Sequence, residues 1–186
     1  MRELALHILD IAENSISAGA DKIKISVNER FDDDLLEFSI EDNGKGMDTE
    51  TLARITDPFV TSRTTRSVGL GIPFLKAAAE ICEGKFEIHS TVGVGTTVQA
   101  AFKHSHIDRM PLGDISSTLQ TLVIGTPDVN WVFEYSVNDD SFVFDDQPIK
   151  ETLQGVPLSE PAVMRFIRET INEGIDEVRK NGRIKT

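Results

Sequence analysis

Asp42 is the residue whose position in the sequence suggests the most specific chemistry. It ends an apolar stretch predicted to be a strand, and it precedes a loop with two glycines, Gly44 and Gly46. A carboxylate fixed at a strand end accepts a hydrogen bond from the exocyclic amine of adenine, whereas guanine presents an acceptor there and is repelled. The glycines let the backbone lie close to the ring, and Met47 supplies an apolar contact. By itself, the segment also fits an ordinary Asp-Asn-Gly turn.

Asn14 and Asp10 lie four residues apart in a predicted helix, so both side chains project from one helical face. An amide oxygen is a neutral, hard ligand that suits Mg²⁺ already bridged to phosphates. The carboxylate of Asp10 could orient an attacking water or take a proton from it. The alternative is a helix end at which Asn14 only satisfies backbone groups.

Glycines and hydroxyl groups that precede a later helix suit a phosphate. The segment Val68-Gly69-Leu70-Gly71 leads directly into that predicted helix, where free N–H groups and the helix dipole favour an anion. The loop before it adds hydroxyls and guanidiniums that suit a triphosphate, namely Thr61, Ser62, Arg63, Thr64 and Arg66. The spacing matches neither a Walker A loop nor a dinucleotide fingerprint. An ordinary loop at a helix start is the alternative.

The hydrophobic pattern predicts the elements that position these residues. Helices are expected over 2–17, 48–55 and 71–83, and strands over 21–30, 35–41, 85–90 and 96–102. The first two strands are expected to pair as a hairpin. This order predicts an α/β (α+β) two-layer sandwich, with a mixed sheet covered by helices on one face.

The chain past Met110 changes in character and is predicted to form a small α+β extension. Residues 129–137 alternate with aromatic side chains and pair with 141–144 as a hairpin, and a long helix with one apolar stripe begins at Pro161. Residues 115–122 fit a short helix or a strand. We therefore divide the chain into a domain over 1–109 and an extension over 110–186 of unassigned function. Its hairpin and helix are expected to be core, with a docking surface as the alternative. Four aspartates are expected to be solvated turn carboxylates, with a cation site as the alternative: Asp139, Asp140, Asp145 and Asp146.

Composition excludes several classes of function. The 186 residues carry 19 Lys and Arg against 31 Asp and Glu, a net charge of -12, without a basic arm. Nonspecific binding to nucleic acid or to an anionic membrane needs clustered positive charge, so neither partner is expected. The single cysteine, Cys82, indicates a reducing compartment. No apolar run is long enough to span a bilayer and no signal segment is evident, so we expect a cytoplasmic protein.

Taken together, these motifs resemble the GHKL ATPase superfamily, named for gyrase, the ninety-kilodalton heat-shock chaperones, histidine kinases and MutL, whose ATP-binding domain has the Bergerat fold. The resemblance covers about residues 1–105. Its motifs are the N box at 13–20, the G1 box at 42–47, the F box at 57–59, the G2 box at 69–72 and the closing Gly-Thr element at 93–97.

The resemblance implies roles for individual residues. Asn14 would hold Mg²⁺, and Asp42 would bind adenine with support from Thr96. The F-box residue Phe59 and the glycine segment 69–71 would line the ATP site, and residues 60–68 would form a short ATP lid. Two positions depart from the family: Asp10 stands where a glutamate base is usual, and Ser17 stands where histidine kinases often carry a basic residue.

The resemblance leaves the fate of the phosphate open. No histidine is followed by the pattern of a phospho-acceptor box, so we expect a stand-alone histidine kinase-like ATPase or protein kinase that acts on a separate partner. That partner would be a response regulator, part of a sigma-factor system or another regulated protein. The alternative is a nucleotide-gated, anti-sigma-factor-like switch with little turnover. The short lid disfavours a third possibility, a MutL-type ATPase cycle.

Overall fold

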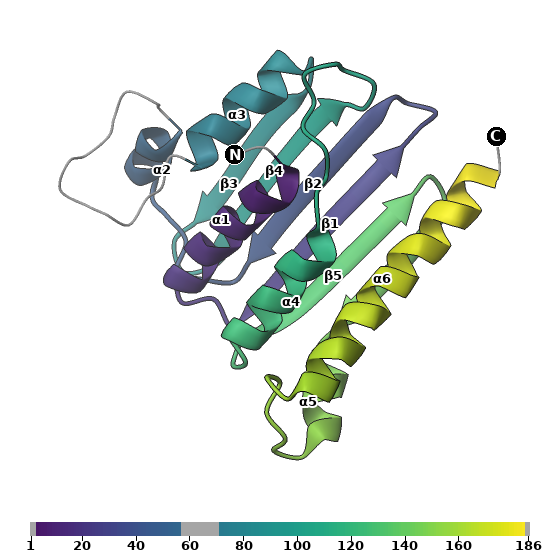
Figure 1. The fold of residues 1–186 in the computed structure, drawn as a ribbon. Helices are drawn as coiled ribbons and strands as arrows, with labels where there is room; N and C mark the ends of the chain where they lie inside the picture. Colours follow the sequence, from purple (N-terminus) through teal and green to yellow (C-terminus); the bar gives the residue numbers. More distant parts are fainter. Residues whose placement is uncertain (1–2, 57–70, 185–186) are drawn as a thin grey trace.

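A six-stranded mixed sheet forms the centre of the fold in the computed structural model, which describes residues 3–56 and 71–184. Helices cover one face of this sheet (Figure 1). The strands are β1 (Lys22–Arg30), β2 (Leu35–Asp42), β3 (Lys85–Thr91), β4 (Gly95–Lys103), β5 (Asn130–Val137) and β6 (Asp140–Asp145). The helices are α1 (Leu4–Ser17), α2 (Thr49–Ile55), α3 (Gly71–Ile81), α4 (Ile115–Gly125), α5 (Gln147–Leu153) and α6 (Pro161–Ile184). The predicted two-layer sandwich is confirmed.

The order of strands across the sheet is β3-β4-β2-β1-β5-β6. β1 and β2 pair antiparallel as the predicted hairpin, with Ile25 opposite Ile40. The C-terminal part of the chain continues the same sheet, because β5 pairs with β1 in parallel and β6 pairs with β5 antiparallel. The division at residue 109 therefore separates two parts of the sequence that share one sheet, and as a domain boundary it remains a prediction.

The aromatic hairpin forms part of the core. Trp131, Phe133 and Tyr135 alternate along β5, and each is at most 1% exposed. They pack under the helices as Ile23 and Ile25 do on β1. The prediction of core packing for this hairpin is therefore confirmed. The ambiguous segment at 115–122 is helical, with Asp114 capping α4 by accepting a hydrogen bond from Ser117 N.

Two glycines let α6 lie directly on the β5–β6 hairpin. A Cβ on Gly174 would lie 2.4 Å from the Phe142 ring, and one on Gly182 would lie 2.5 Å from Val137 Cγ1. Both distances are too short for real carbon contacts, so any larger residue would push the helix away from the sheet. Within residues 3–56 and 71–184, no helix is both long and apolar enough to cross a membrane.

Asp146 corrects the interpretation of the acidic turn residues. Its side chain is 0% exposed, so it is not a solvated carboxylate. Oδ1 accepts hydrogen bonds from Trp131 N and Asn130 Nδ2, and Oδ2 pairs with Lys150 Nζ at 2.7 Å. The residue ties the end of β6 to β5 and precedes α5, a helix that the periodicity did not predict. The pairing of β6 with β5 buries this carboxylate, and the sequence pattern around Asp146 does not reveal that pairing.

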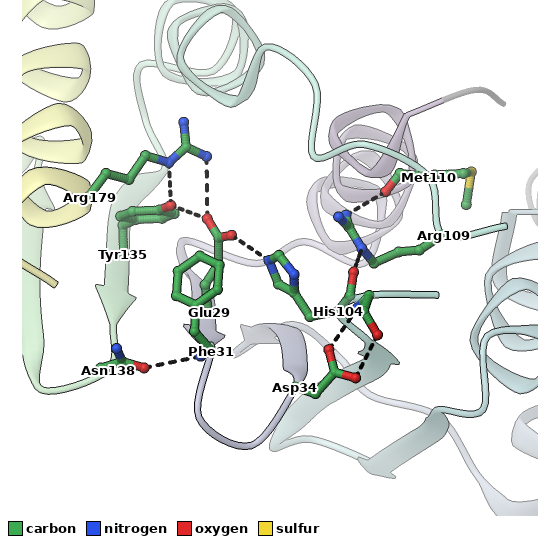
Figure 2. Close-up of polar contacts among 10 residues, drawn as sticks. Glu29, Phe31, Asp34, His104, Arg109, Met110, Tyr135, Asn138 and Arg179 are labelled. Carbon is green, nitrogen blue, oxygen red and sulfur yellow. Dashed lines mark hydrogen bonds and ion pairs between the residues drawn. The ribbon is translucent and has the colours of Figure 1, made fainter. Parts of the chain in front are cut away.

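A polar cluster around the buried carboxylate of Glu29 joins α6 to the strands (Figure 2). Glu29 is 7% exposed. One of its oxygens accepts hydrogen bonds from the Tyr135 hydroxyl and from Arg179 Nη2, and the other lies 2.9 Å from His104 Nε2. Arg179 Nε also donates to the Tyr135 hydroxyl at 2.6 Å. Burial would raise the pKa of Glu29, but the hydrogen bonds from Tyr135 and His104 and the charge of Arg179 outweigh it and lower the pKa.

The Glu29 cluster makes the stability of the fold vary with pH in the acidic range. A carboxyl whose folded pKa lies below its ordinary value of 4.5 stabilises the fold fully above that pH, and this contribution is lost as the pH falls through the folded pKa. We expect Glu29→Gln to lower the free energy of unfolding at pH 7 by about 2 kcal/mol, because Tyr135 and Arg179 lose a charged hydrogen-bond acceptor. The difference from wild type should shrink below pH 4.5.

Urea unfolding followed by circular dichroism at several pH values measures this difference. Glu173→Gln is the matched control, because Glu173 is an exposed carboxylate on α6. A gap between Glu29→Gln and wild type that stays constant from pH 7 to well below pH 4.5 would show that ionised Glu29 does not stabilise the fold.

Candidate functional site

A pocket of about 310 Å³ opens between α1, α2, α3 and the sheet. Five residues singled out from the sequence line it, namely Asn14, Asp42, Gly46, Met47 and Thr96. Its walls are largely apolar and come from several elements, through Ile11, Met47, Ile55, Ile72, Ile88 and Val98. An apolar cavity of this size with a few convergent polar groups is typical of a small-molecule site.

Asp42 is held in a fixed orientation within the pocket. Oδ2 accepts a hydrogen bond from Ser15 Oγ at 2.6 Å, and Oδ1 accepts one from Gly44 N at 2.9 Å. A carboxylate has about four acceptor positions, so each oxygen can still accept from a ligand. Sequence reasoning did not assign Ser15 this role. The signal that could have found it is its place on the buried face of α1, one residue after Asn14.

Asn43 anchors the strand end that carries Asp42. Its Oδ1 accepts hydrogen bonds from Asp21 N and Lys22 N, and its Nδ2 donates to Asp21 Oδ1 at 2.6 Å. The carboxylate of Asp42 therefore stands on a segment tied directly to the start of β1. This attachment limits the motion of Asp42 relative to the sheet.

The glycines of the loop after β2 are required by the protein backbone itself. Gly46 has φ +64°, and a Cβ there would lie 2.0 Å from the Thr91 carbonyl oxygen. A Cβ on Gly44 would lie 3.0 Å from the Ala18 Cβ. Sequence reasoning gave these glycines the task of admitting a flat ligand. The structure adds that they let the loop pass between α1 and the β3–β4 turn.

Asn14 and Asp10 are two polar residues of α1: Asn14 lines the pocket, and Asp10 lies against Gly71 at the start of α3. The Asn14 Nδ2 and the Asp10 Oδ2 are buried and have no hydrogen-bond partner within the described parts of the chain. A Cβ on Gly71 would lie 1.7 Å from Asp10 Oδ2, so a larger residue there would require the Asp10 carboxylate to move. His7 belongs to the same group, and its burial lowers its pKa. Within the described residues, the hydrogen-bonding capacity of the Asn14 Nδ2 and the Asp10 Oδ2 is therefore unused.

Some predicted site residues lie apart from the pocket or outside the described residues. Asp10, Gly44 and Gly71 are described but do not line the pocket. The remaining predicted residues lie outside the described ranges, and their roles stay predictions: Phe59, Thr61, Ser62, Arg63, Gly69 and Leu70.

Ser90 is a second polar residue that sequence reasoning missed. Its Oγ accepts a hydrogen bond from Met47 N at 2.8 Å and lies 2.9 Å from Thr96 Oγ1. Nothing in the local sequence distinguishes Ser90 from any other serine in a strand. Its role arises from the register of β3 on β4, which places Ser90 opposite Thr96.

A larger hollow of about 430 Å³ lies near the same end of the sheet, lined in part by Lys22, Lys24 and His89. It is more polar and open, and its lining does not include Asn14 or an apolar wall comparable to that of the smaller pocket. We therefore place the functional site in the smaller pocket. In the described parts of the chain, no group of three or more His, Cys, Asp or Glu side chains is arranged for a metal ion. Any metal here would need most of its ligands from a bound molecule.

Comparison with known proteins agrees with this geometry. The family model for histidine kinase-, DNA gyrase B- and HSP90-like ATPases matches residues 2–106. The chain is 33% identical over 111 residues to the non-motile and phage-resistance protein of Caulobacter vibrioides. This alignment covers 55% of this chain and 13% of that protein. It is 39% identical over 89 residues to the sensor protein kinase FleS of Pseudomonas aeruginosa, covering 48% of this chain and 22% of that one. The matches thus span less than a quarter of these relatives.

Two solved structures share the fold. The Aquifex aeolicus MutL ATPase domain complexed with ADP superposes with a TM-score of 0.51 at 12% identity, covering 83% of this chain and 70% of that one. The N-terminal domain of a DNA repair protein gives a TM-score of 0.58 at 14% identity, covering 94% of this chain and 57% of that one. At such low identity, the similarity establishes the fold alone.

Proposed function

Because the chain belongs to the histidine kinase-, DNA gyrase B- and HSP90-like ATPase family, we propose that its pocket binds ATP with Mg²⁺ and directs the γ-phosphate to a separate protein. The observation that carries this proposal is the fixed carboxylate of Asp42 in an apolar pocket, with Asn14 on its wall. The curated relatives support phosphoryl transfer, since FleS is named a sensor protein kinase.

The adenine end of the proposed site depends on Asp42. Ser15 and Gly44 fix the two oxygens of its carboxylate, so the remaining lone pairs point in set directions. The exocyclic amine of adenine donates to this carboxylate, and the apolar side chains of Met47 and Ile88 flank the ring. A hydrogen bond to a charged group contributes about 1.5–3 kcal/mol, enough to select adenine over a purine with an oxo group at the same position.

The phosphate end of the proposed site lies where α1 meets the start of α3. Asn14 fits a magnesium ligand, because it lines the pocket and its amide oxygen is a neutral, hard ligand. Mg²⁺, when bound, would neutralise phosphate charge there. Asp10 accepts the proton of the attacking group through Oδ2, which has no hydrogen-bond partner among residues 3–56 and 71–184. The first backbone N–H groups of α3, beside Gly71, favour a phosphate oxygen.

A nucleotide-gated switch with little turnover is the second candidate. The observation in its favour is that Asp10 lies outside the pocket lining and abuts Gly71, so its short side chain has limited reach. ATP labelled in the γ-phosphate separates the candidates when the chain is incubated with purified response regulators and sigma-factor regulators. Label on a partner supports the kinase, label in free phosphate supports an ATPase, and tight binding with unreacted ATP supports the switch.

The magnesium role of Asn14 is tested by Asn14→Ala. We expect ATP binding by the wild type to strengthen when Mg²⁺ is added, and binding by Asn14→Ala to change by less than about twofold, because one metal ligand is lost. Calorimetric titration of ATP with and without Mg²⁺ measures the difference. Asn172→Ala, which removes an exposed amide on α6, is the matched control. A full magnesium response in Asn14→Ala contradicts the assignment.

A further inference from the structure

Ser90 makes three polar contacts, two of them with the pocket-lining residues Met47 and Thr96. Its Oγ accepts from Met47 N at 2.8 Å, donates to the Gly95 carbonyl oxygen at 3.1 Å and lies 2.9 Å from Thr96 Oγ1. β3 places Ser90 opposite Thr96, and β4 places Thr96 opposite Asp42. One row across three strands therefore connects Ser90 with the carboxylate that the proposed function assigns to adenine.

Counting protons fixes the direction of each of these hydrogen bonds. A serine hydroxyl has one proton to donate and two lone pairs that accept. The Gly95 carbonyl can only accept, so it takes the Ser90 proton, and Met47 N–H can only donate. The remaining lone pair of Ser90 must then accept from Thr96. Thr96 therefore donates its hydroxyl proton to Ser90, and the Thr96 oxygen offers only lone pairs to the pocket that Thr96 lines.

We infer that Ser90 is a specificity-determining residue that holds the Thr96 hydroxyl as an acceptor and so selects a purine with an amine at C6. This inference rests on the proposed function. Asp42 also only accepts, so the polar end of the pocket presents two acceptors side by side on neighbouring strands. An exocyclic amine has two N–H groups and can donate to both acceptors. A C6 oxo group would face acceptors alone and leave them unpaired.

Substitution of Ser90 by alanine tests the inference. In Ser90→Ala the Thr96 hydroxyl is released, and it can rotate to donate to an oxo group. ITP has the same ribose and triphosphate as ATP and differs in carrying an oxo group at C6. We expect the ratio of ATP affinity to ITP affinity to fall by about fivefold in Ser90→Ala, the effect of one hydrogen bond. Ser90→Thr keeps the hydroxyl and should retain the wild-type ratio.

The ratio separates a specificity role from a structural one. If Ser90 only supported the loop at Met47, its loss would weaken ATP and ITP binding equally and leave the ratio unchanged. The double variant Ser90→Ala with Thr96→Ala supplies a second check. The change in ratio caused by Ser90→Ala should vanish when Thr96 lacks its hydroxyl. Thr97→Ala, which removes the neighbouring hydroxyl on the other face of β4, is the matched control and should leave the ratio unchanged.

Calorimetric titration of the full chain with Mg²⁺ and either ATP or ITP gives both affinities, with thermal unfolding as the check on folding. Should Ser90→Ala not fold, Ser90→Cys replaces it, because a thiol is a weak donor and acceptor. An unchanged ratio in a folded variant that still binds ATP overturns the role of Ser90 alone. Failure of the wild type to bind either nucleotide overturns the proposed function as well.

Discussion

Asp42→Asn is expected to weaken ATP binding by about 100-fold, because it replaces a charged acceptor with a neutral amide. The fold should stay intact, because the two side chains are equal in size. Ser15 Oγ and Gly44 N both donate to Asp42 in the structure, and the adenine amine would be a third donor. A carboxylate accepts from all three. A carboxamide offers a single oxygen, and its NH₂ group faces at least one of these donors with another donor. Calorimetric titration with ATP measures the loss.

Glu41→Gln is the matched control for Asp42→Asn. Glu41 is the preceding residue on β2, it is exposed, and its substitution removes the same charge from the opposite face of the sheet. We expect Glu41→Gln to bind ATP as the wild type does. Wild-type affinity in Asp42→Asn would show that adenine does not bind at this carboxylate, and a variant that melts far below the wild type would point to a structural role.

Asp10→Asn is expected to slow the chemical step by about 100-fold to 10,000-fold, the usual contribution of a general base. Affinity for ATP should change little, because Asp10 does not line the pocket. Asparagine keeps the shape of the side chain beside Gly71, so the start of α3 should stay in place. Single-turnover assays with γ-labelled ATP, scored as phosphate released or transferred, measure this step.

Glu13→Gln is the control for Asp10→Asn, because Glu13 is an exposed carboxylate on the same helix. Its substitution should leave turnover within about twofold of wild type, as is usual for exposed positions. Turnover at the wild-type rate in Asp10→Asn would remove Asp10 from the reaction. An equal loss of ATP affinity and of turnover would indicate that Asp10 supports binding instead.

The sequence predicted those parts of the fold that depend on neighbouring residues. The period of α1 and the alternation of β1 and β2 are local, and each element follows the predicted bounds within a few residues. The start of α2 is also fixed locally, because Asp48 caps it by accepting a hydrogen bond from Thr51 N. The order of motifs also predicted the family, now supported by the match over residues 2–106.

Local patterns failed where the competing structures differ only in long-range contacts. The segment that forms α4 was compatible with helix or strand, and its packing against α1 and α6 selects the helix. α5 was missed because its seven residues carry no buried side chain and hence no periodic signal. Asp146 was taken for a solvated residue, yet the pairing of β6 with β5 buries it.

The sequence by itself determined the kind of chemistry: an amide on a helix, an acidic residue at a strand end and glycines after it, all recognised by their spacing. Only the tertiary structure decided how these groups are supported. Ser15 reaches Asp42 across 27 residues, and Glu29 meets Tyr135 across 106. The physical reason is that hydrogen-bond direction, burial and sheet register arise from contacts between distant segments, which local propensity does not contain.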